Sequence, residues 1–127
     1  MELKKTRPNI LVIGDYNIAH EEIDIHAPKR NENNSGFLRP ERDWMTKWFA
    51  ETGLVDTFRA LHPEKVAYSW WSYRAPDWDT AYKGRRLDHV WATPDIANSA
   101  HSSRVIRSVR GWEQPSDHAP VFATFDL

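Results

Sequence analysis

The chain has 127 residues, a formal net charge of −1 and no cysteine. This length suffices for one domain that buries a core without disulfides, and the absence of cysteine excludes thiolate metal sites, which leaves oxygen and imidazole ligands. The net charge excludes a generally basic coat, so a nucleic acid has to be met by a local patch. No apolar stretch reaches transmembrane length, and residues 1–5 lack the apolar core of a signal peptide. We therefore predict a single cytoplasmic domain over residues 1–127 with no membrane partner.

The first apolar run, Ile10 to Gly14, contains no alternating polar residues. This pattern predicts a strand covered on both faces, as in the parallel sheets of α/β domains. Asp15 follows at the carboxyl end of the strand, the edge where open α/β sheets bind ligands. Because side chains alternate along an extended segment, Asp15 and Asn17 are expected to project from the same side.

A helix is predicted between Pro40 and Gly53, with apolar residues at helical spacing between them. Proline is well tolerated at the first helical position, and glycine suits the left-handed residue that ends a helix. A shorter helix is predicted from Asp56 to about His62, because a proline follows it.

Four later segments have the composition of strands, and a loop is predicted from Arg74 to Gly84. The strand candidates are Tyr68–Tyr73, Arg86–Trp91, Ser103–Val109 and Val121–Phe125. Thr93-Pro94-Asp95 has the cap and first-turn chemistry of a short helix. Together with the first run, these segments predict an α/β fold with a mixed sheet of about five strands.

Acidic turns occur near both ends of the chain, at Asp15 and Asn17 and at Asp117 and His118. If the two turns meet, they supply the carboxylates, amide and imidazole needed for metal-assisted attack on a phosphodiester. Asp88 can accept a hydrogen bond from His118 and set its tautomer. The alternatives are a capped turn at Asp15, a histidine fixed for structural reasons, and an ion pair between Asp88 and a neighbouring arginine.

An aromatic and basic segment follows in the middle of the chain. Trp70 can line a pocket for an extruded or missing base, and core packing is the alternative for this tryptophan or its neighbour. Arg74, Lys83, Arg85 and Arg86 bracket one loop and either bind phosphates or form solvated surface. Their proximity to Trp70 in the sequence favours phosphates.

Taken together, the segments resemble the exonuclease III type of AP endonuclease, within the endonuclease/exonuclease/phosphatase superfamily. The resemblance runs in order over nearly the whole chain. It rests on Gly14-Asp15-Tyr16-Asn17-Ile18, Phe37-Leu38-Arg39-Pro40-Glu41-Arg42-Asp43-Trp44, Gly53-Leu54-Val55-Asp56-Thr57-Phe58-Arg59, Tyr68-Ser69-Trp70-Trp71-Ser72-Tyr73-Arg74, Gly84-Arg85-Arg86-Leu87-Asp88 and Pro115-Ser116-Asp117-His118-Ala119-Pro120-Val121.

This resemblance implies a role for each polar residue. Asp15 activates the attacking water or assists the leaving oxygen, and Asn17 orients the phosphate. His118 stabilises the transition state or acts as the base, and Asp88 orients His118. The resemblance also implies a magnesium or manganese ion, with Asp117 and Asp15 at the metal site.

The DNA contacts implied by the resemblance are Trp70 at the wall of the pocket for the abasic sugar, with the basic residues around it. The substrate implied is DNA with an abasic site or a processable 3′ end.

The resemblance covers only the carboxyl-terminal half of the family's domain. It therefore implies one half of a four-layer α/β sandwich, with helices on one face of the sheet and the other face available for a partner. That partner is either the missing amino-terminal half or a second copy in a homodimer. The missing half ordinarily supplies a metal-binding glutamate.

Three hypotheses follow. The first is metal-dependent hydrolysis of DNA phosphodiesters in repair, of the AP endonuclease or 3′-5′ exonuclease type. The second is an inactive half-domain that self-associates or binds DNA without cutting it. The third is a phosphodiesterase of the same superfamily that acts on another phosphoester.

Overall fold

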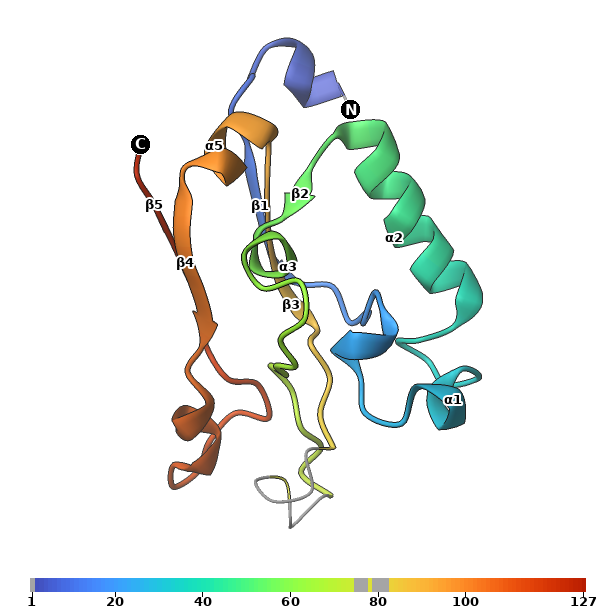
Figure 1. The fold of residues 1–127 in the computed structure, drawn as a ribbon. Coiled ribbons are helices and arrows are strands. Elements are labelled where there is room, and N and C mark those ends of the chain that lie inside the picture. The colour runs from blue at the N-terminus through green and yellow to red at the C-terminus, as the bar shows by residue number, and fades with distance from the viewer. Residues whose placement is uncertain (1, 75–77, 79–82) are drawn as a thin grey trace.

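The computed structural model describes residues 2–74, 78 and 83–127 (Figure 1). The strands are β1 (Leu11–Asp15), β2 (Val55–Asp56), β3 (Asp88–Ala92), β4 (Ala100–Val105) and β5 (Val121–Phe125). The α-helices are α1 (Pro28–Asn31), α2 (Arg39–Thr52), α3 (Thr57–Leu61) and α5 (Pro94–Asn98), and short 3-10 helices span Glu2–Lys5, Glu22–Asp24 and Arg107–Gly111. The α/β class predicted from the sequence is confirmed.

The strands form two antiparallel sheets rather than the mixed sheet that was expected. One sheet has the order β1-β3-β2, and the other pairs β4 with β5. In Figure 1 the longer helix α2 is drawn to the right of the three-stranded sheet, and β4 and β5 are drawn to its left. Among the described residues every strand pair is antiparallel, so the parallel pairing inferred from the first apolar run is wrong.

One face of β1 packs under α2 and the other face is bare. Val12 of β1 packs against Met45 of α2 and Trp91 of β3, which are 0% and 1% exposed. Leu11 and Ile13, on the opposite face, are 44% and 66% exposed. The residues that the structure describes therefore cover this strand on one face, and the apolar side chains of its other face are exposed, as expected for a sheet with one face available for a partner.

Helix α2 begins and ends at the residues that the sequence pattern indicates, within one position. Pro40 lies in the first turn, and the Glu41 carboxylate accepts hydrogen bonds from the backbone amides of Gly36 and Leu38. Gly53 has a φ of 72° and donates its amide to the carbonyl of Phe49. This left-handed conformation is one that glycine adopts at little cost.

The short helix α3 is confirmed close to its predicted range. Asp56 caps it by accepting a hydrogen bond of 3.2 Å from the backbone amide of Arg59. The cap satisfies one of the amides that a helix leaves free at its amino end.

Two strand predictions differ from the structure. The segment Tyr68–Tyr73 is not a strand, because Trp70 alone forms isolated bridges, to Arg85 and to His118. The strand predicted over Ser103–Val109 is β4 up to Val105, after which the chain turns into a 3-10 helix. Aromatic and hydroxyl side chains favour strands, but Trp70 bridges two loops and has no continuous neighbouring strand.

The remaining segments agree with the sequence predictions. Strand β5 has the predicted range, β3 begins at Asp88, and the predicted short helix after Thr93 is α5. Most of the predicted loop from Arg74 to Gly84 lies outside the described residues. Within the described part of the chain, no helix has the length and apolar character needed to cross a membrane.

Candidate active site

Two carboxylates lie side by side at one end of the three-stranded sheet. Asp15 is the last residue of β1 and Asp88 is the first residue of β3, and the two are paired directly in the antiparallel register. Residues paired in this way point to the same face of a sheet, with their Cβ atoms about 5 Å apart. The backbone pairing of β1 and β3 therefore holds the two carboxylates close to each other.

His118 completes this cluster from the turn before β5. Its Nδ1 lies 2.8 Å from Oδ2 of Asp88, and its Nε2 lies 3.5 Å from Oδ2 of Asp15. A carboxylate only accepts hydrogen bonds, so Nδ1 carries the hydrogen and Nε2 faces Asp15. The two acidic turns, 103 residues apart when counted from Asp15 to His118, thus meet as the sequence predicted.

The turn that carries His118 is held by backbone hydrogen bonds to the segment around Trp70. The amide of Trp71 donates to the carbonyl of Asp117 over 3.0 Å, and the amide of Ala119 donates to the carbonyl of Ser69 over 2.8 Å. These bonds lie on either side of His118. They fix the imidazole relative to the segment on which Trp70 lies.

Ser69 is a supporting residue that sequence reasoning missed. Its side chain is fully buried, and its hydroxyl oxygen accepts hydrogen bonds from the amides of Leu87 and Asp88 over 3.0 and 3.1 Å. Ser69 therefore holds the start of β3, which carries Asp88, as well as the turn of His118. A serine between aromatic residues was the only signal in the sequence.

Asp117 and Trp70 contact each other at the edge of the cluster. The indole Nε1 of Trp70 donates to Oδ2 of Asp117 over 3.0 Å, and the other carboxylate oxygen lies 3.9 Å from Nε2 of His118. Trp70 also packs on a core cluster with Phe37 and Leu87, so part of this ring belongs to the core. The core-packing alternative for Trp70 therefore describes part of its environment, and its place at the wall of a base pocket stays a prediction.

Asn17 lies two residues beyond Asp15 but not in extended backbone. Its φ of 54° is left-handed, and its amide donates to Oδ1 of Asp15 over 2.8 Å. The argument that strand alternation places both side chains on one side is therefore wrong. Among the described residues, the Asn17 side chain makes no hydrogen bond, which leaves its amide group available to a ligand.

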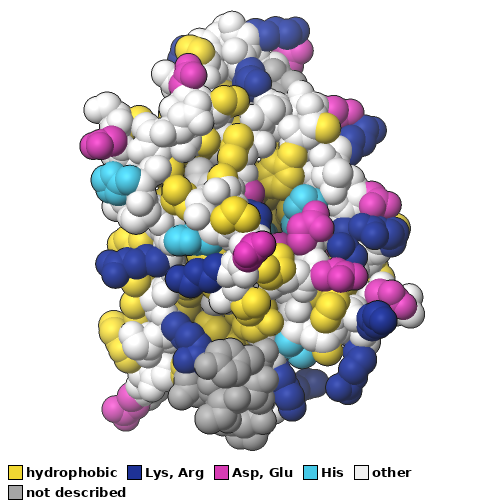
Figure 2. Space-filling model, viewed as in Figure 1, with side chains coloured by type: hydrophobic (Ala, Val, Ile, Leu, Met, Phe, Trp, Pro, Cys, Tyr) yellow, Lys and Arg dark blue, Asp and Glu magenta, His cyan; other side chains and the backbone are white. Residues whose placement is uncertain are grey.

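Three of the predicted basic residues lie at the surface or half-buried near Trp70. Arg85 stacks over the Trp70 ring at 5.7 Å and donates to the carbonyl of Ser35 over 2.8 Å. Partial burial lowers the pKa of Arg85. Arg74 and Lys83 are exposed. Figure 2 shows basic side chains interspersed with acidic ones over this view of the molecule rather than a basic coat.

Arg86 is the fourth of the predicted basic residues. It is buried and not available for DNA contacts, so its prediction as a DNA-binding residue is wrong. Its side chain is 2% exposed, and it pairs with Asp24 over 2.8 Å and with Asp56 over 2.5 Å. Burial would lower the pKa of Arg86, but these two carboxylates raise it instead. Arg86 joins the segment before α1 to the cap of α3.

Asp15, Asp88 and His118 also lie close enough together to hold a metal ion. One ligand atom from each lies within 4.8 Å of the others. Hard divalent cations prefer carboxylate oxygens and accept one or two of them together with water. The donor set thus fits such an ion, and Asp88 is a candidate ligand that the sequence analysis did not consider.

Comparisons with known proteins agree with this geometry. Residues 1–118 match the model of the endonuclease/exonuclease/phosphatase family. The chain is 40% identical over 122 residues to an exodeoxyribonuclease of Bacillus subtilis, covering 95% of this chain and 46% of that protein.

Two solved structures have a closely similar fold. An AP endonuclease from Archaeoglobus fulgidus superimposes with a TM-score of 0.90 at 34% identity, covering 94% of this chain and 46% of that one. A 3′ phosphatase from Neisseria bound to a product DNA hairpin gives a TM-score of 0.90 at 34% identity, covering 98% and 48%. The chain spans about half the length of the relatives it matches. It belongs to the endonuclease/exonuclease/phosphatase family.

Proposed function

We propose that this chain carries part of the catalytic centre of a divalent-metal-dependent DNA phosphodiester hydrolase of repair, of the AP endonuclease or 3′-5′ exonuclease type. The observation that carries the proposal is the line of Asp88, His118 and Asp15, in which each group lies within 3.5 Å of the next. Relatives named exodeoxyribonuclease and AP endonuclease support the choice of DNA as the substrate.

His118 is the group that accepts or donates a proton in this proposal. Asp88 holds Nδ1 of the imidazole in its protonated form, which leaves Nε2 directed toward Asp15. An imidazole oriented by a carboxylate can take a proton from water or stabilise charge that develops on a phosphate. Asp88 is a positioning residue in this arrangement, because it acts through His118.

Asp15 and Asn17 are the other two polar groups that we propose act on the reacting phosphate, and Asp15 lies next to His118. The Asp15 carboxylate accepts a proton from the attacking water or assists the leaving oxygen, and the Asn17 amide donates to a phosphate oxygen. A bound magnesium or manganese ion would supply charge neutralisation at the phosphate. Asp15 and Asp117 are the ligands proposed from the sequence, whereas the group whose ligand atoms lie within 4.8 Å of one another consists of Asp15, Asp88 and His118.

Trp70 and the basic residues beside it are the proposed DNA contacts. The indole ring of Trp70 provides a flat apolar wall, and the guanidinium of Arg85 lies over that ring. Arg74, four residues after Trp70, and Lys83, two residues before Arg85, are exposed. Aromatic rings stack on bases, and cations pair with phosphates, so this set suits a DNA strand at the catalytic cluster.

The cytoplasmic location expected from the sequence stays a prediction.

The bare face of β1 favours a second candidate function. Ile13 is 66% exposed and lies two residues before Asp15, in a hollow with Val90 and Val121. An exposed apolar face of a sheet is an association surface. We propose that it is covered either by a unit equivalent to the part of the relatives that this chain does not span, or by a second copy. In this second candidate function, which is the alternative to hydrolysis by the chain alone, the chain without the first partner is an inactive half-domain that self-associates or binds DNA.

The test is nicking of a duplex with one abasic site by the 127-residue chain in magnesium or manganese. We expect nicking that disappears with EDTA and in His118→Ala, and that persists in His101→Ala, which changes an exposed histidine of β4. Hydrolysis that survives both EDTA and His118→Ala contradicts the mechanism. A dimer in size-exclusion chromatography that shows no metal-dependent nicking supports the half-domain instead.

A further inference from the structure

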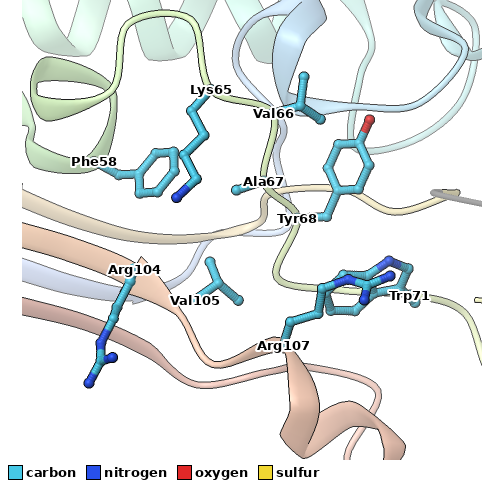
Figure 3. Close-up of a pocket in the computed structure, with 9 residues that line it drawn as sticks. All are labelled: Phe58, Lys65, Val66, Ala67, Tyr68, Trp71, Arg104, Val105 and Arg107. Carbon is cyan, nitrogen blue, oxygen red and sulfur yellow. The ribbon is translucent and has the colours of Figure 1, made fainter. Parts of the chain in front are cut away.

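A second cavity lies apart from the catalytic cluster, between helix α3 with the segment that follows it and the end of β4 (Figure 3). Its walls are mainly apolar, with rings from Phe58, Tyr68 and Trp71 and aliphatic groups from Ala67 and Val105. It shares no side chain with Asp15, Asp88 or His118. The proposed hydrolysis therefore leaves this cavity without a role.

The charged side chains around this cavity are all cationic. They are Lys65, Arg104 and Arg107, and among the described residues no aspartate or glutamate lines the cavity. In Figure 3 the Lys65 ammonium group extends past Phe58 on the cavity side, whereas the Arg104 guanidinium points away toward the outer edge.

Lys65 and Arg107 occupy opposite ends of the cavity in this view. The Arg107 guanidinium lies 5.8 Å from the centre of the Trp71 ring. Lys65 forms no ion pair with any residue that the structure describes, and its backbone carbonyl is held by Arg59 over 2.8 Å. A cation whose main chain is held next to an apolar cavity is placed to receive the anionic group of a ligand.

The size of the cavity restricts the ligand to one ring. Its volume is about 180 Å³. An apolar cavity of about 150 Å³ accommodates benzene, so a single six-membered ring fits here, and a fused two-ring system is expected to fit less well. Most ligand sites combine an apolar cavity with a few polar groups that fix orientation, as this one does.

We propose that this cavity binds a phosphate ester that carries a single aromatic ring, such as a pyrimidine nucleoside monophosphate. The ring lies among Phe58, Tyr68 and Val105, and the phosphate contacts the ammonium group of Lys65. This inference stands on the cavity alone and does not depend on the proposed nuclease activity.

The experiment is a titration of the full ¹⁵N-labelled chain, followed by NMR in EDTA so that no metal-bound phosphate forms at the catalytic cluster. The probes are deoxythymidine monophosphate and phenyl phosphate. Thymidine lacks the anion, glycerol phosphate lacks the ring, and deoxyadenosine monophosphate carries two fused rings. We expect both probes to shift the amide signals of Ala67 and Val105 and to bind at least about tenfold more tightly than the other three compounds.

Two variants and a matched control locate the site. Lys65→Gln should weaken binding of both probes by about tenfold, and Ala67→Phe should abolish it by filling the cavity. Lys47→Gln, at an exposed lysine of α2, should change nothing. The thermal midpoint of each variant shows whether it is folded. A titration of the double variant Asp15→Asn, His118→Ala should retain the wild-type affinity, which separates this site from the catalytic cluster.

The proposal is overturned if glycerol phosphate binds as tightly as phenyl phosphate, or if the shifts occur around His118 rather than Ala67. It is equally overturned if folded Lys65→Gln and Ala67→Phe bind both probes with wild-type affinity.

Discussion

The carboxylate of Asp88 lies 2.8 Å from Nδ1 of His118, and this contact joins the first residue of β3 to the turn before β5. The side chain of His118 is 28% exposed and that of Asp88 is 21% exposed, so both are partly accessible to solvent. The contact orients the imidazole toward Asp15, and the consequences of losing it can be measured.

Replacing Asp88 with asparagine should lower the turnover of abasic DNA by about 10- to 100-fold or more, because the imidazole loses the group that orients it. The affinity for DNA and the thermal midpoint should stay close to wild type, since Asp88 does not contact the substrate in the proposed arrangement. Single-turnover kinetics and a binding titration measure the two quantities. Asp95→Asn, at an exposed acid of α5, is the control. Equal losses in affinity and turnover would speak against a positioning role.

Arg86→Met should destabilise the fold by about 3–5 kcal/mol, because it leaves the buried carboxylates of Asp24 and Asp56 without their main partner. Urea denaturation followed by tryptophan fluorescence measures this free energy. The control is Arg39→Met, which breaks an exposed pair with Asp43 that is worth about 0.5 kcal/mol at most. Similar losses in the two variants would show that the buried pairs contribute no more than exposed ones.

The stability of the protein should fall in acid partly through Asp24. Burial would raise the pKa of Asp24, but the charge and hydrogen bonds of Arg86, with further hydrogen bonds from Glu21 and Arg59, lower it from 3.8 to about 2. Because the folded pKa lies below the unfolded one, this stabilisation is complete above the unfolded value of 3.8 and is lost as the pH falls through about 2. The difference amounts to about 2 kcal/mol.

Denaturation curves between about pH 5 and pH 2 test this linkage. The free energy of unfolding of the wild type should fall by about 2 kcal/mol more over this range than that of Asp24→Asn. Asp126→Asn, near the exposed end of β5, should follow the wild-type curve. Parallel curves for wild type and Asp24→Asn would refute the assignment.

The exposed face of β1 predicts association that a single charge should prevent. Ile13→Glu places a carboxylate on the exposed face of β1, and desolvating this carboxylate on association would be costly. We expect the variant to elute as a monomer at concentrations where the wild type associates. Val66→Glu, at a similarly exposed aliphatic residue after α3, should elute like the wild type. A wild type that is monomeric at all concentrations would instead exclude the second copy as the partner.

Local chemistry explains which parts of the fold were predictable from the sequence. Helix α2 was recognisable because Pro40 and Gly53 act through their own backbone conformations, and β5 because its apolar run is bounded by turn residues. The segment around Trp70 was not, because its composition favours a strand whereas its hydrogen-bond partners come from distant loops.

In the candidate site, too, the features with a local sequence pattern were predictable and those that depend on distant partners were not. The acidic turns at Asp15 and His118 were predicted to meet, and they do. The charge of Arg86 alone predicts a surface residue. Its burial depends on Asp24 and Asp56, which lie 62 and 30 positions away in the sequence. Long-range pairing of this kind leaves no local pattern. The buried role of Ser69 was missed for the same reason.

The hydrogen bonds of Ser69 affect how variants of this protein should be interpreted. Its hydroxyl secures the strand that bears one member of the acid–imidazole pair, and its carbonyl secures the turn that bears the other. A single buried residue thus holds the imidazole and the carboxylate that orients it in register. An alanine at this position would remove the two hydroxyl hydrogen bonds to β3 and keep the carbonyl bond to the turn, so any loss of the proposed activity would come from the placement of Asp88.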